Sequence, residues 1–355
     1  MASVSEKKVD SSSTGAFTIH YFATASQYTS KNTERLPAPL RLSELYTLLE
    51  ERYPGICEKI LGSCGVSLES EYVDIQEDAH KVIQVGDEKP VLVIVPGAYH
   101  RPVHYRKVID PLRTQGYEVL SFDLAVCGEE VGTELSFFDD AALIKAHLLP
   151  LLDEGKKAVV ISHSYGSLPV TALVDGQTVS ERTEKGLNGG IAAVINIAGF
   201  VFPVRGKSVL GNEQNPPPPP YQIRKVSHVK KTVSMPAIFS LTFIQDGIAY
   251  LQETAKSVFF SDLAPEEADD AWARLHKKQT TKSMDTWPQC VESDYRCPKT
   301  YILCENDTAV PPVFQEQMAG LGGFDIVRVK SSHAPFLTIP EEVVAIVTRV
   351  AEAVN

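Results

Sequence analysis

A serine with a small residue two positions away on either side follows a strongly apolar segment near the middle of the chain. Residues 162–166, Ser-His-Ser-Tyr-Gly, come directly after Ala-Val-Val-Ile at 158–161, and a helical segment follows them. A strand, a sharp turn and a helix in this order are typical of a nucleophile elbow, in which small residues on either side let backbones approach. Gly166 fits this pattern, and Ser162 replaces its usual first glycine. We predict Ser164 as a nucleophile, although a serine beside a glycine is more commonly a structural turn.

A serine hydroxyl needs a base, and a carboxylate to orient that base, before it can act as a nucleophile near neutral pH. In elbow-containing hydrolases these partners follow the serine as acid and then histidine. Asp307 stands after the apolar run 301–304, and His333 stands after the run 326–329. Each would be a cap or structural residue in isolation, but together they indicate a Ser164, Asp307, His333 triad. Glu305 is a weaker candidate for the acid, because it is nearer the strand and is expected to point away from the histidine.

Ester hydrolysis also needs hydrogen-bond donors for the oxyanion, and loss of one donor costs roughly 3 kcal/mol of barrier. Residues 95–100, Val-Pro-Gly-Ala-Tyr-His, follow an apolar run at a turn that can direct a backbone N–H at the serine. We predict the N–H groups of Ala98 and Tyr165 as these donors. His100 could reach the pocket, although a surface histidine is the more common case.

The segments that would position these residues alternate between strands and helices from Pro90 onward. Continuous apolar runs are typical of strands buried on both faces of a sheet. Residues 91–95 form such a run, and five further apolar segments are predicted as strands, at residues 117–122, 158–162, 191–197, 300–304 and 325–329. Helices are expected at 104–115, from the capping residue Ser136 to about 150, and at 340–354. The alternation predicts a mostly parallel sheet flanked by helices.

The stretch from residue 202 to about residue 289, called the insertion below, interrupts this alternation and is expected to be a lid. Residues 216–220 are consecutive prolines, which favour a stiff extended piece, and amphipathic helices are expected around Leu251 and Trp272. The prolines could instead recruit a partner domain, but an internal loop is the more common use. The basic residues that follow are interpreted as a solvated surface, namely Arg224, Lys225, Lys230 and Lys231.

Residues 16–88 are expected to form a separate, small α+β unit. Residues 17–22 have an alternating pattern rich in aromatic and β-branched side chains, as a strand does, and the leucine spacing predicts a helix over 43–52. Ser43 is placed to cap this helix, and Pro54-Gly55 ends it. Short strands are expected after the helix, near residues 65–68, 72–75 and 81–84.

Composition and charge limit the classes of partner. Hydrophobic residues make up 43% of the 355 residues and charged residues 22%, which is ordinary for globular proteins. The formal net charge of −11 disfavours nucleic acid and anionic membranes, because both select clustered lysine and arginine. No segment offers the ~18 uninterrupted apolar residues of a membrane span, and residues 1–15, expected to be a disordered tail, contain no signal-peptide apolar region. We expect a soluble cytoplasmic protein.

The cysteines suggest neither a disulfide framework nor a metal site. They are scattered without a C-x-x-C pair, which indicates reduced thiols in a cytosolic setting, at positions 57, 64, 127, 290, 297 and 304. Cys290, Cys297 and Cys304 repeat every seven residues, but no pair of histidines accompanies them. We expect no metal and no other cofactor.

Four motifs together resemble one family. They are Val-Pro-Gly-Ala-Tyr-His at 95–100, Ser-His-Ser-Tyr-Gly at 162–166, Cys-Glu-Asn-Asp-Thr-Ala-Val-Pro at 304–311 and Ser-His-Ala-Pro-Phe-Leu at 332–337. Over about residues 89–355 the chain resembles the α/β-hydrolase superfamily, specifically fungal and bacterial relatives of plant methyl-ester esterases and hydroxynitrile lyases. The resemblance implies the fold of that family, the triad Ser164, Asp307 and His333, and an oxyanion hole at Ala98 and Tyr165.

The same resemblance narrows the reaction. The lyase branch carries a lysine directly after the catalytic histidine, whereas Ala334 follows His333 here, so cyanohydrin cleavage is disfavoured. Ser164 also disfavours the dehalogenase and epoxide-hydrolase branches, which use aspartate at that position. The resemblance therefore implies an esterase-like enzyme that cleaves a small-molecule ester or related carbonyl compound through an acyl-enzyme.

The first unit resembles a different family. The motifs are Phe-Thr-Ile-His-Tyr-Phe-Ala at 17–23, Leu-Ser-Glu-Leu-Tyr at 42–46, Tyr-Pro-Gly at 53–55, Glu-Tyr-Val at 71–73 and Gln-Val-Gly-Asp-Glu at 84–88. They are similar to the molybdopterin synthase sulfur-carrier subunit, a ubiquitin-like protein. The resemblance implies a role in molybdenum-cofactor biosynthesis with the large subunit of molybdopterin synthase as a partner. That family works through a terminal Gly-Gly, which becomes a thiocarboxylate, whereas this chain continues into Lys89-Pro90-Val91.

The two resemblances compete for one segment. The carrier's last strand lies in the middle of its sheet, but residues 91–95 are also expected to begin the hydrolase sheet. We assign them to the hydrolase, which leaves a truncated ubiquitin-like unit, as a chain joined from two neighbouring reading frames would have. Three functions follow: a serine esterase, a sulfur carrier whose Gly-Gly end occurs in another product of the gene, and a ligand-binding protein that keeps the hydrolase pocket without turnover.

Overall fold

The computed structural model describes residues 15–68, 71–83, 89–202, 204–209 and 241–354. The chain divides into two compact units, Met1–Glu88 and Lys89–Asn355. Several expectations concern residues outside the described ranges, namely the tail at 1–14, the run at 84–88, the prolines at 216–220 and the basic residues between 224 and 231.

The first unit is an α+β fold in which strands pair antiparallel around one amphipathic helix. The pairs are β1 (Gly15–His20) with β2 (Thr33–Ala38), β3 (Leu40–Arg41) with β6 (Val82–Ile83), and β4 (Val66–Leu68) with β5 (Glu71–Val73). The helices are α1 (Thr24–Thr29), α2 (Leu42–Arg52) and α3 (Ile56–Lys59). Leu42, Leu45 and Leu49 lie on one face of α2 and are buried in the core of the unit.

Two details of the first unit differ from the sequence prediction. The helix α2 begins at Leu42 and its N-cap is Arg41, so Ser43 lies inside the first turn and does not cap. The Glu44 carboxylate instead accepts the N–H of Arg41 at 3.3 Å. The sequence pattern also does not predict β2, because charged residues and Pro37 interrupt its apolar alternation.

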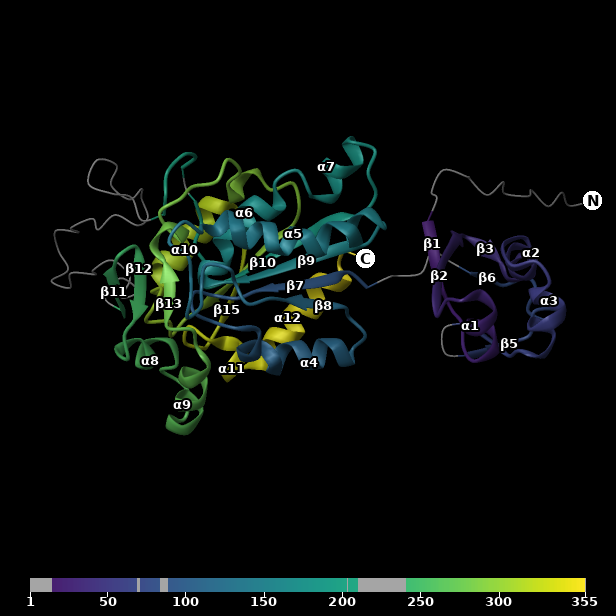
Figure 1. The fold of residues 1–355 in the computed structure, drawn as a ribbon, viewed down its shortest axis with the longest axis horizontal. Coiled ribbons are helices and arrows are strands. Elements are labelled where there is room, and N and C mark those ends of the chain that lie inside the picture. Colours follow the sequence, from purple (N-terminus) through teal and green to yellow (C-terminus); the bar gives the residue numbers. More distant parts are fainter. Residues whose placement is uncertain (1–14, 69–70, 84–88, 203, 210–240, 355) are drawn as a thin grey trace, which may run out of the picture. The chain divides into compact units, whose positions relative to one another are not determined.

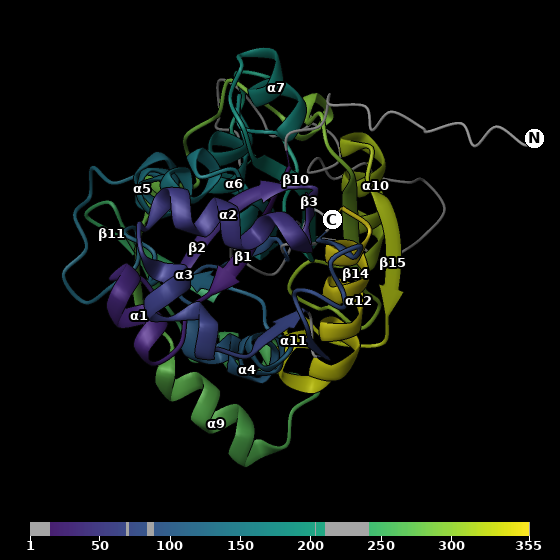
Figure 2. The same cartoon turned by 90° about the vertical axis from the view of Figure 1, so that its right-hand side faces the viewer.

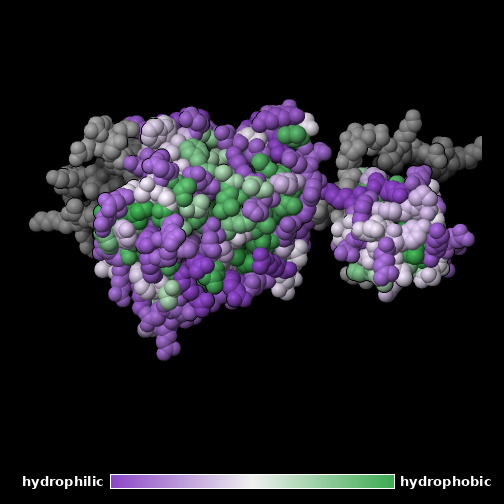
Figure 3. All heavy atoms as spheres, in the orientation of Figure 1, coloured by the Kyte–Doolittle hydropathy of each residue, from purple (hydrophilic) through white to green (hydrophobic). Residues whose placement is uncertain are grey.

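The second unit contains a six-stranded sheet in which every pairing is parallel. In spatial order the strands are β15 (Asp325–Val329), β14 (Lys299–Cys304), β10 (Gly190–Ile197), β9 (Lys157–His163), β7 (Val91–Val95) and β8 (Val119–Ser121). The six apolar runs of the sequence correspond to these strands, so the α/β fold with a parallel sheet is confirmed. Figure 3 shows hydrophobic side chains gathered over the middle of this unit, where Figure 1 draws the strands.

Helices cover both faces of this sheet (Figure 1). On one face lie α5 (Phe137–Asp153) and α6 (Ser167–Val174), and on the other lie α4 (Arg106–Thr114), α11 (Pro335–Thr338) and α12 (Pro340–Glu352). Other helices are α7 (Val179–Glu184) and α10 (Pro312–Gly322), which packs against β14 and β15 as Figure 2 shows. The predicted cap of α5 is confirmed, since the hydroxyl of Ser136 accepts the N–H of Phe138 at 3.3 Å. None of the helices in the described ranges is long and apolar enough to span a membrane.

The strand β7 lies inside the sheet of the second unit. Val91 pairs with Ala158 of β9, and Leu92 pairs with both Val159 of β9 and Val119 of β8, so both edges of β7 are used. All five of its residues are buried. Within the described part of the first unit, β1 pairs with β2 alone. The contested segment is therefore a strand of the hydrolase sheet.

The insertion contains a small antiparallel sheet that the sequence reasoning missed. It consists of β11 (Thr242–Gln245), β12 (Ile248–Leu251) and β13 (Lys278–Thr280), with α8 (Thr254–Phe259) and α9 (Pro265–Arg274) between the last two strands. The expectation of a helix around Leu251 is wrong, because this residue ends β12, whereas Trp272 does lie in a helix. Asp246 and Gly247 form the turn, and their φ values of 50° and 77° are those of a tight hairpin.

Candidate active site

Ser164 lies at a sharp turn between β9 and α6. Its φ of 49° is in the left-handed region, which residues other than glycine rarely adopt. A Cβ atom at Gly166 would lie 2.4 Å from the carbonyl oxygen of Val95, so only glycine fits where this turn meets the end of β7. The hydroxyl of Ser162, at the position of the usual first glycine, lies 3.2 Å from Oδ1 of Asn196 on β10 and donates to it. The strand, turn and helix have the geometry of a nucleophile elbow.

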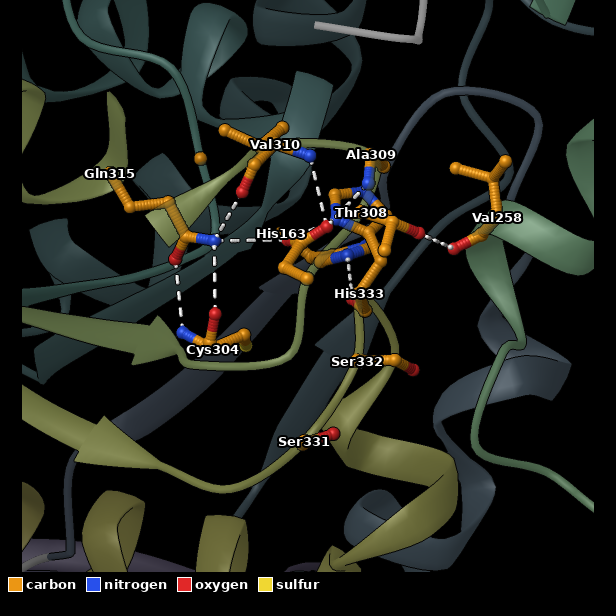
Figure 4. A network of polar contacts seen from close by, with 12 residues as sticks. His163, Val258, Cys304, Thr308, Ala309, Val310, Gln315, Ser331, Ser332 and His333 are labelled. Atoms are coloured by element: carbon orange, nitrogen blue, oxygen red, sulfur yellow. Dashed lines mark hydrogen bonds and ion pairs between the residues drawn. The ribbon is translucent and has the colours of Figure 1, made fainter. Parts of the chain in front are cut away.

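Asp307 and His333 meet at the carboxyl ends of β14 and β15. Oδ2 of Asp307 lies 2.7 Å from Nδ1 of His333, and Figure 4 shows the surrounding polar network. Oδ1 of the same carboxylate accepts the N–H groups of Ala309 at 2.8 Å and Val310 at 2.9 Å. The exposed fractions of Ser164, Asp307 and His333 are 2%, 3% and 1%, so all three side chains are shielded from solvent.

Gln315 completes the environment of the carboxylate and was not expected from the sequence. Its Nε2 donates to Oδ2 of Asp307 at 3.0 Å, and its Oε1 accepts the N–H of Cys304 at 3.0 Å. Figure 4 shows the amide of Gln315 between these two segments. Since Gln315 is on α10 and is fully buried, it joins the helix to the end of β14. A glutamine in a helix carries no sequence signal for this role.

The bond to Asp307 fixes the tautomer of neutral His333. A carboxylate can only accept, so Nδ1 carries the hydrogen and Nε2 keeps its lone pair, as a general base requires. In the part of the chain that the structure describes, no hydrogen bond joins Ser164 to the ring of His333. Such bonds are often long before substrate binds. Among the described residues, Asp307 is therefore hydrogen-bonded to His333, whereas Ser164 is not.

The loop after β7 lies directly against the elbow. A Cβ atom at Gly97 would be 3.3 Å from Cβ of Ser164, which brings the neighbouring Ala98 close to the nucleophile. Ala98 and Tyr165, the two predicted oxyanion donors, are both buried. The hydroxyl of Tyr165 donates to Oδ2 of Asp140 at 2.7 Å, and burial raises the pKa of that carboxyl to about 7.

His100 is buried, so the expectation of a surface histidine is wrong. It is only 1% exposed, and Nδ1 lies 2.9 Å from the carbonyl oxygen of Ala98. The rings of Phe259, Phe260 and Phe336 lie within 6.0 Å of its own, measured between centroids. Burial lowers the pKa of His100 well below its usual range, so the ring is neutral.

The insertion contributes side chains to this site. The ring of Phe259, at the end of α8, stacks on His333 with centroids 5.6 Å apart and an interplanar angle of 25°. The hydroxyl of Thr308 donates to the carbonyl oxygen of Val258 at 3.4 Å, which Figure 4 shows. Thr308 and His333, about fifty and seventy residues further along the chain, thus both contact α8.

Glu305 and the cysteines lie outside this arrangement. Glu305 is exposed, and its N–H donates to the carbonyl oxygen of Val329, so it is not the acid beside His333. The cysteines are free thiols. Within the described ranges, no group of three or more His, Cys, Asp or Glu side chains is arranged to hold a metal ion.

Comparison with known proteins assigns each unit to a family. The Alpha/beta hydrolase family matches residues 92–346. The "Alpha/beta hydrolase nvfD" of Aspergillus novofumigatus is 28% identical over 267 residues, which are 74% of this chain and 97% of the relative. The "Molybdopterin synthase sulfur carrier subunit" of Aspergillus niger is 58% identical over 81 residues, which are 23% of this chain and 92% of the relative.

Solved structures share the fold of the larger unit. A pyrethroid hydrolase from Sphingobium faniae has a TM-score of 0.55 at 18% identity, covering 74% of this chain and 98% of that one. Polyneuridine aldehyde esterase has a TM-score of 0.55 at 17% identity, covering 74% of this chain and all of that one (100%). The chain therefore belongs to the α/β-hydrolase family, and its first unit belongs to the family of molybdopterin synthase sulfur carrier subunits.

Proposed function

We propose that the second unit is a serine hydrolase that cleaves a small carboxylic ester through an acyl-enzyme. The observation that carries the proposal is the buried pair of Asp307 and His333, 2.7 Å apart, beside a serine held at a left-handed turn. The carboxylate accepts two backbone N–H groups and a Gln315 N–H, so it is held as an acceptor for the histidine. Solved structures of the same fold include proteins named as hydrolases and esterases, in agreement with this class.

The mechanism assigns one task to each side chain. Oγ of Ser164 attacks the ester carbonyl carbon while Nε2 of His333 takes its proton, and Asp307 stabilises the resulting imidazolium. The backbone N–H groups of Ala98 and Tyr165 donate to the oxyanion. His333 then gives its proton to the departing alkoxide, which leaves as an alcohol. Water repeats the same sequence at the acyl carbon, and the acid and free Ser164 are released.

A fluorophosphonate probe tests this assignment directly. The probe should label Ser164, because its Oγ forms a bond to phosphorus as fluoride leaves. The Ser164→Ala variant should lose both labelling and ester hydrolysis, while Ser180→Ala should retain them, since Ser180 lies on α7 and its hydroxyl donates to the carbonyl oxygen of Arg296. Labelling that survives the Ser164 substitution would exclude this nucleophile. Labelling without turnover on p-nitrophenyl esters of graded acyl length would favour the ligand-binding alternative.

The insertion is proposed as the lid that shapes the acyl and alcohol sites. Its α8 contributes Phe259 beside His333, so substitutions in this helix should alter substrate preference. The ester series above measures this: Phe259→Ala should shift activity towards longer acyl chains because it removes a ring next to the base. An unchanged acyl-length profile would show that the insertion does not shape the site.

A second candidate function concerns the first unit, which is 58% identical to a sulfur carrier subunit over 81 residues. A sulfur carrier that works with the large subunit of molybdopterin synthase requires a free Gly-Gly end, as the carrier family has. Here the chain continues from Glu88 into Lys89 and then into β7, both edges of which are paired. Transcript sequencing across this junction would test the alternative. A second transcript that ends in Gly-Gly would support a carrier, and a single continuous transcript would exclude it.

A further inference from the structure

A chain of three buried hydrogen bonds joins the loop after β7, the turn at Ser164 and the loop that carries His333. The N–H of Gly97 donates to the hydroxyl oxygen of Tyr105 at 2.9 Å. That hydroxyl lies 2.8 Å from Nδ1 of His163, and Nε2 of His163 lies 2.9 Å from the carbonyl oxygen of His333. No local sequence pattern indicates a role for His163, because its two partners are 58 and 170 residues away.

The direction of each bond in this chain follows from its ends. The carbonyl oxygen of His333 can only accept, so Nε2 of His163 carries a hydrogen. Full burial and the neighbouring histidines lower the pKa of His163 well below its usual range, which keeps the ring neutral and Nδ1 unprotonated. Tyr105 must therefore donate its hydroxyl hydrogen to Nδ1, and the lone pairs of that oxygen accept the N–H of Gly97. The three hydrogen bonds therefore have one consistent assignment of donors and acceptors.

The residues that form these three hydrogen bonds are buried and tightly packed. The exposed fractions of Tyr105 and His163 are 2% and 1%. The ring of Phe336 stacks on Tyr105 with centroids 4.1 Å apart and lies 4.8 Å from His163. A Cβ atom at Gly97 would lie 2.6 Å from Nδ1 of His163, so the backbone at Gly97 packs directly against the His163 ring. Hydrogen bonds between such buried groups are strong, and a buried polar group left without a partner is costly.

We propose that His163 and Tyr105 are positioning residues. They fix the relative positions of the loop after β7, the nucleophile Ser164 and the general base His333. Gly97 precedes the proposed donor Ala98, His163 precedes Ser164, and the last acceptor is the backbone of His333 itself. The inference rests on the proposed serine hydrolase function. Since a misplacement of about 1 Å can cost roughly 100-fold in rate, the chain has a measurable consequence.

Tyr105→Phe is the principal test, because it removes one oxygen and leaves the ring in place. We expect kcat for a p-nitrophenyl ester to fall by about 10- to 100-fold with KM within about twofold, and the phosphonylation rate to fall in parallel. The matched control is Tyr301→Phe, which also deletes a buried hydroxyl in this unit, one that donates to the carbonyl oxygen of Gly199 at 2.7 Å. A control with a similar melting temperature and near wild-type kcat separates positioning from loss of stability.

Two substitutions at His163 test its two hydrogen bonds separately. His163→Gln places an N–H near the position of Nε2 and loses the acceptor for Tyr105, whereas His163→Asn keeps that acceptor and loses the donor to His333. Both should lower kcat. Because Tyr105→Phe and His163→Gln remove the same bond, the double variant should be no worse than the worse single variant. Multiplied losses would show that the two residues act separately and would overturn the proposal.

The outcomes distinguish this inference from the proposed function. If the fluorophosphonate does not label the wild-type protein, the hydrolase assignment fails before the variants are compared. If the wild type is labelled and active but a folded Tyr105→Phe retains kcat within about twofold, the positioning role is wrong and the hydrolase assignment stands. Should Tyr105→Phe not fold, His163→Gln decides by the same criteria.

Discussion

The amide and hydroxyl of Ser332, the residue before His333, both donate to the carboxylate of Asp262. Asp262 lies between α8 and α9 of the insertion, and its Oδ2 accepts the N–H of Ser332 at 2.7 Å. Ser332 is fully buried, so the carboxylate fixes the backbone from which the histidine projects. The insertion is therefore tied to the loop of the proposed general base by charge-assisted hydrogen bonds.

Asp262→Ala should lower kcat by about 10-fold with the fold retained, because the Ser332 turn loses its anchor while His333 keeps its bond to Asp307. Steady-state kinetics on a p-nitrophenyl ester measures this effect. The matched control is Asp269→Ala, which removes a carboxylate on α9 that pairs with Lys256 at the surface. Equal losses in the two variants would show that the insertion acts only through its general stability.

Asp307→Asn should reduce kcat by close to 10⁴-fold without unfolding the protein, since an amide can turn its NH₂ towards His333 and hold the wrong tautomer. Circular dichroism confirms the fold, and kcat gives the loss. Glu305→Gln is the control, because Glu305 is an exposed carboxylate two residues away. If Glu305→Gln were the damaging substitution, the assignment of the acid would be wrong.

Glu292 should make the stability of the second unit depend on pH. Its Oε2 accepts the N–H of Phe202 at 2.8 Å, its Oε1 has no partner among the described residues, and burial raises its pKa from 4.5 to about 8. The folded state therefore binds a proton more tightly than the unfolded state between pH 4.5 and 8. The resulting stabilisation is fully present below pH 4.5 and is lost as the pH rises towards 8.

Thermal unfolding of the wild type and Glu292→Gln from pH 5 to pH 8 checks this sign. The glutamine cannot ionise, so the melting temperature of the wild type should fall relative to the variant as the pH rises. Glu305→Gln should run parallel to the wild type, because Glu305 is exposed. A constant difference between the wild type and Glu292→Gln would show that Glu292 keeps one protonation state across this range.

A fragment that begins at Gly86 should hydrolyse esters like the full chain, because it retains β7 and every proposed catalytic residue. A fragment of residues 1–88 should be poorly folded, since a unit of this size with an unpaired strand edge has little stability to spare. The measurements are an ester assay on the first fragment, and circular dichroism with amide dispersion on the second. A well-dispersed short fragment beside an inactive long one would reverse the assignment of β7.

The sequence predicts the larger sheet well because the strands β7, β9, β10 and β14 are largely buried on both faces. Residues 91–95 and 158–162 are continuous apolar runs, and such a run has few other uses in a soluble protein. The hairpin of the insertion was missed because residues 242–251 mix polar and apolar side chains without a clean period. Its strongest local signal is the pair Asp246-Gly247, which favours a tight turn.

Only part of the candidate site can be predicted from the sequence. Ser164, Asp307 and His333 follow from residue types at the ends of strands, a pattern that depends on local order along the chain. His100, Gln315 and the hydrogen-bond chain through His163 depend on distant contacts, and a buried histidine has no local signature. The partners of His163 come from residue 105 and from the carbonyl of residue 333. Only the folded arrangement identifies them.

The left-handed turn at position 164 also bears on how the gene evolves. A non-glycine residue in this conformation is disfavoured by roughly 1–2 kcal/mol, a cost that glycine avoids. Under the proposed mechanism, in which Ser164 is the nucleophile, selection for hydrolysis would retain the serine against this cost. If that selection were relaxed, replacement by glycine should stabilise the fold and abolish the proposed reaction together. Natural variation at this codon therefore reports whether the encoded protein is still selected as an enzyme.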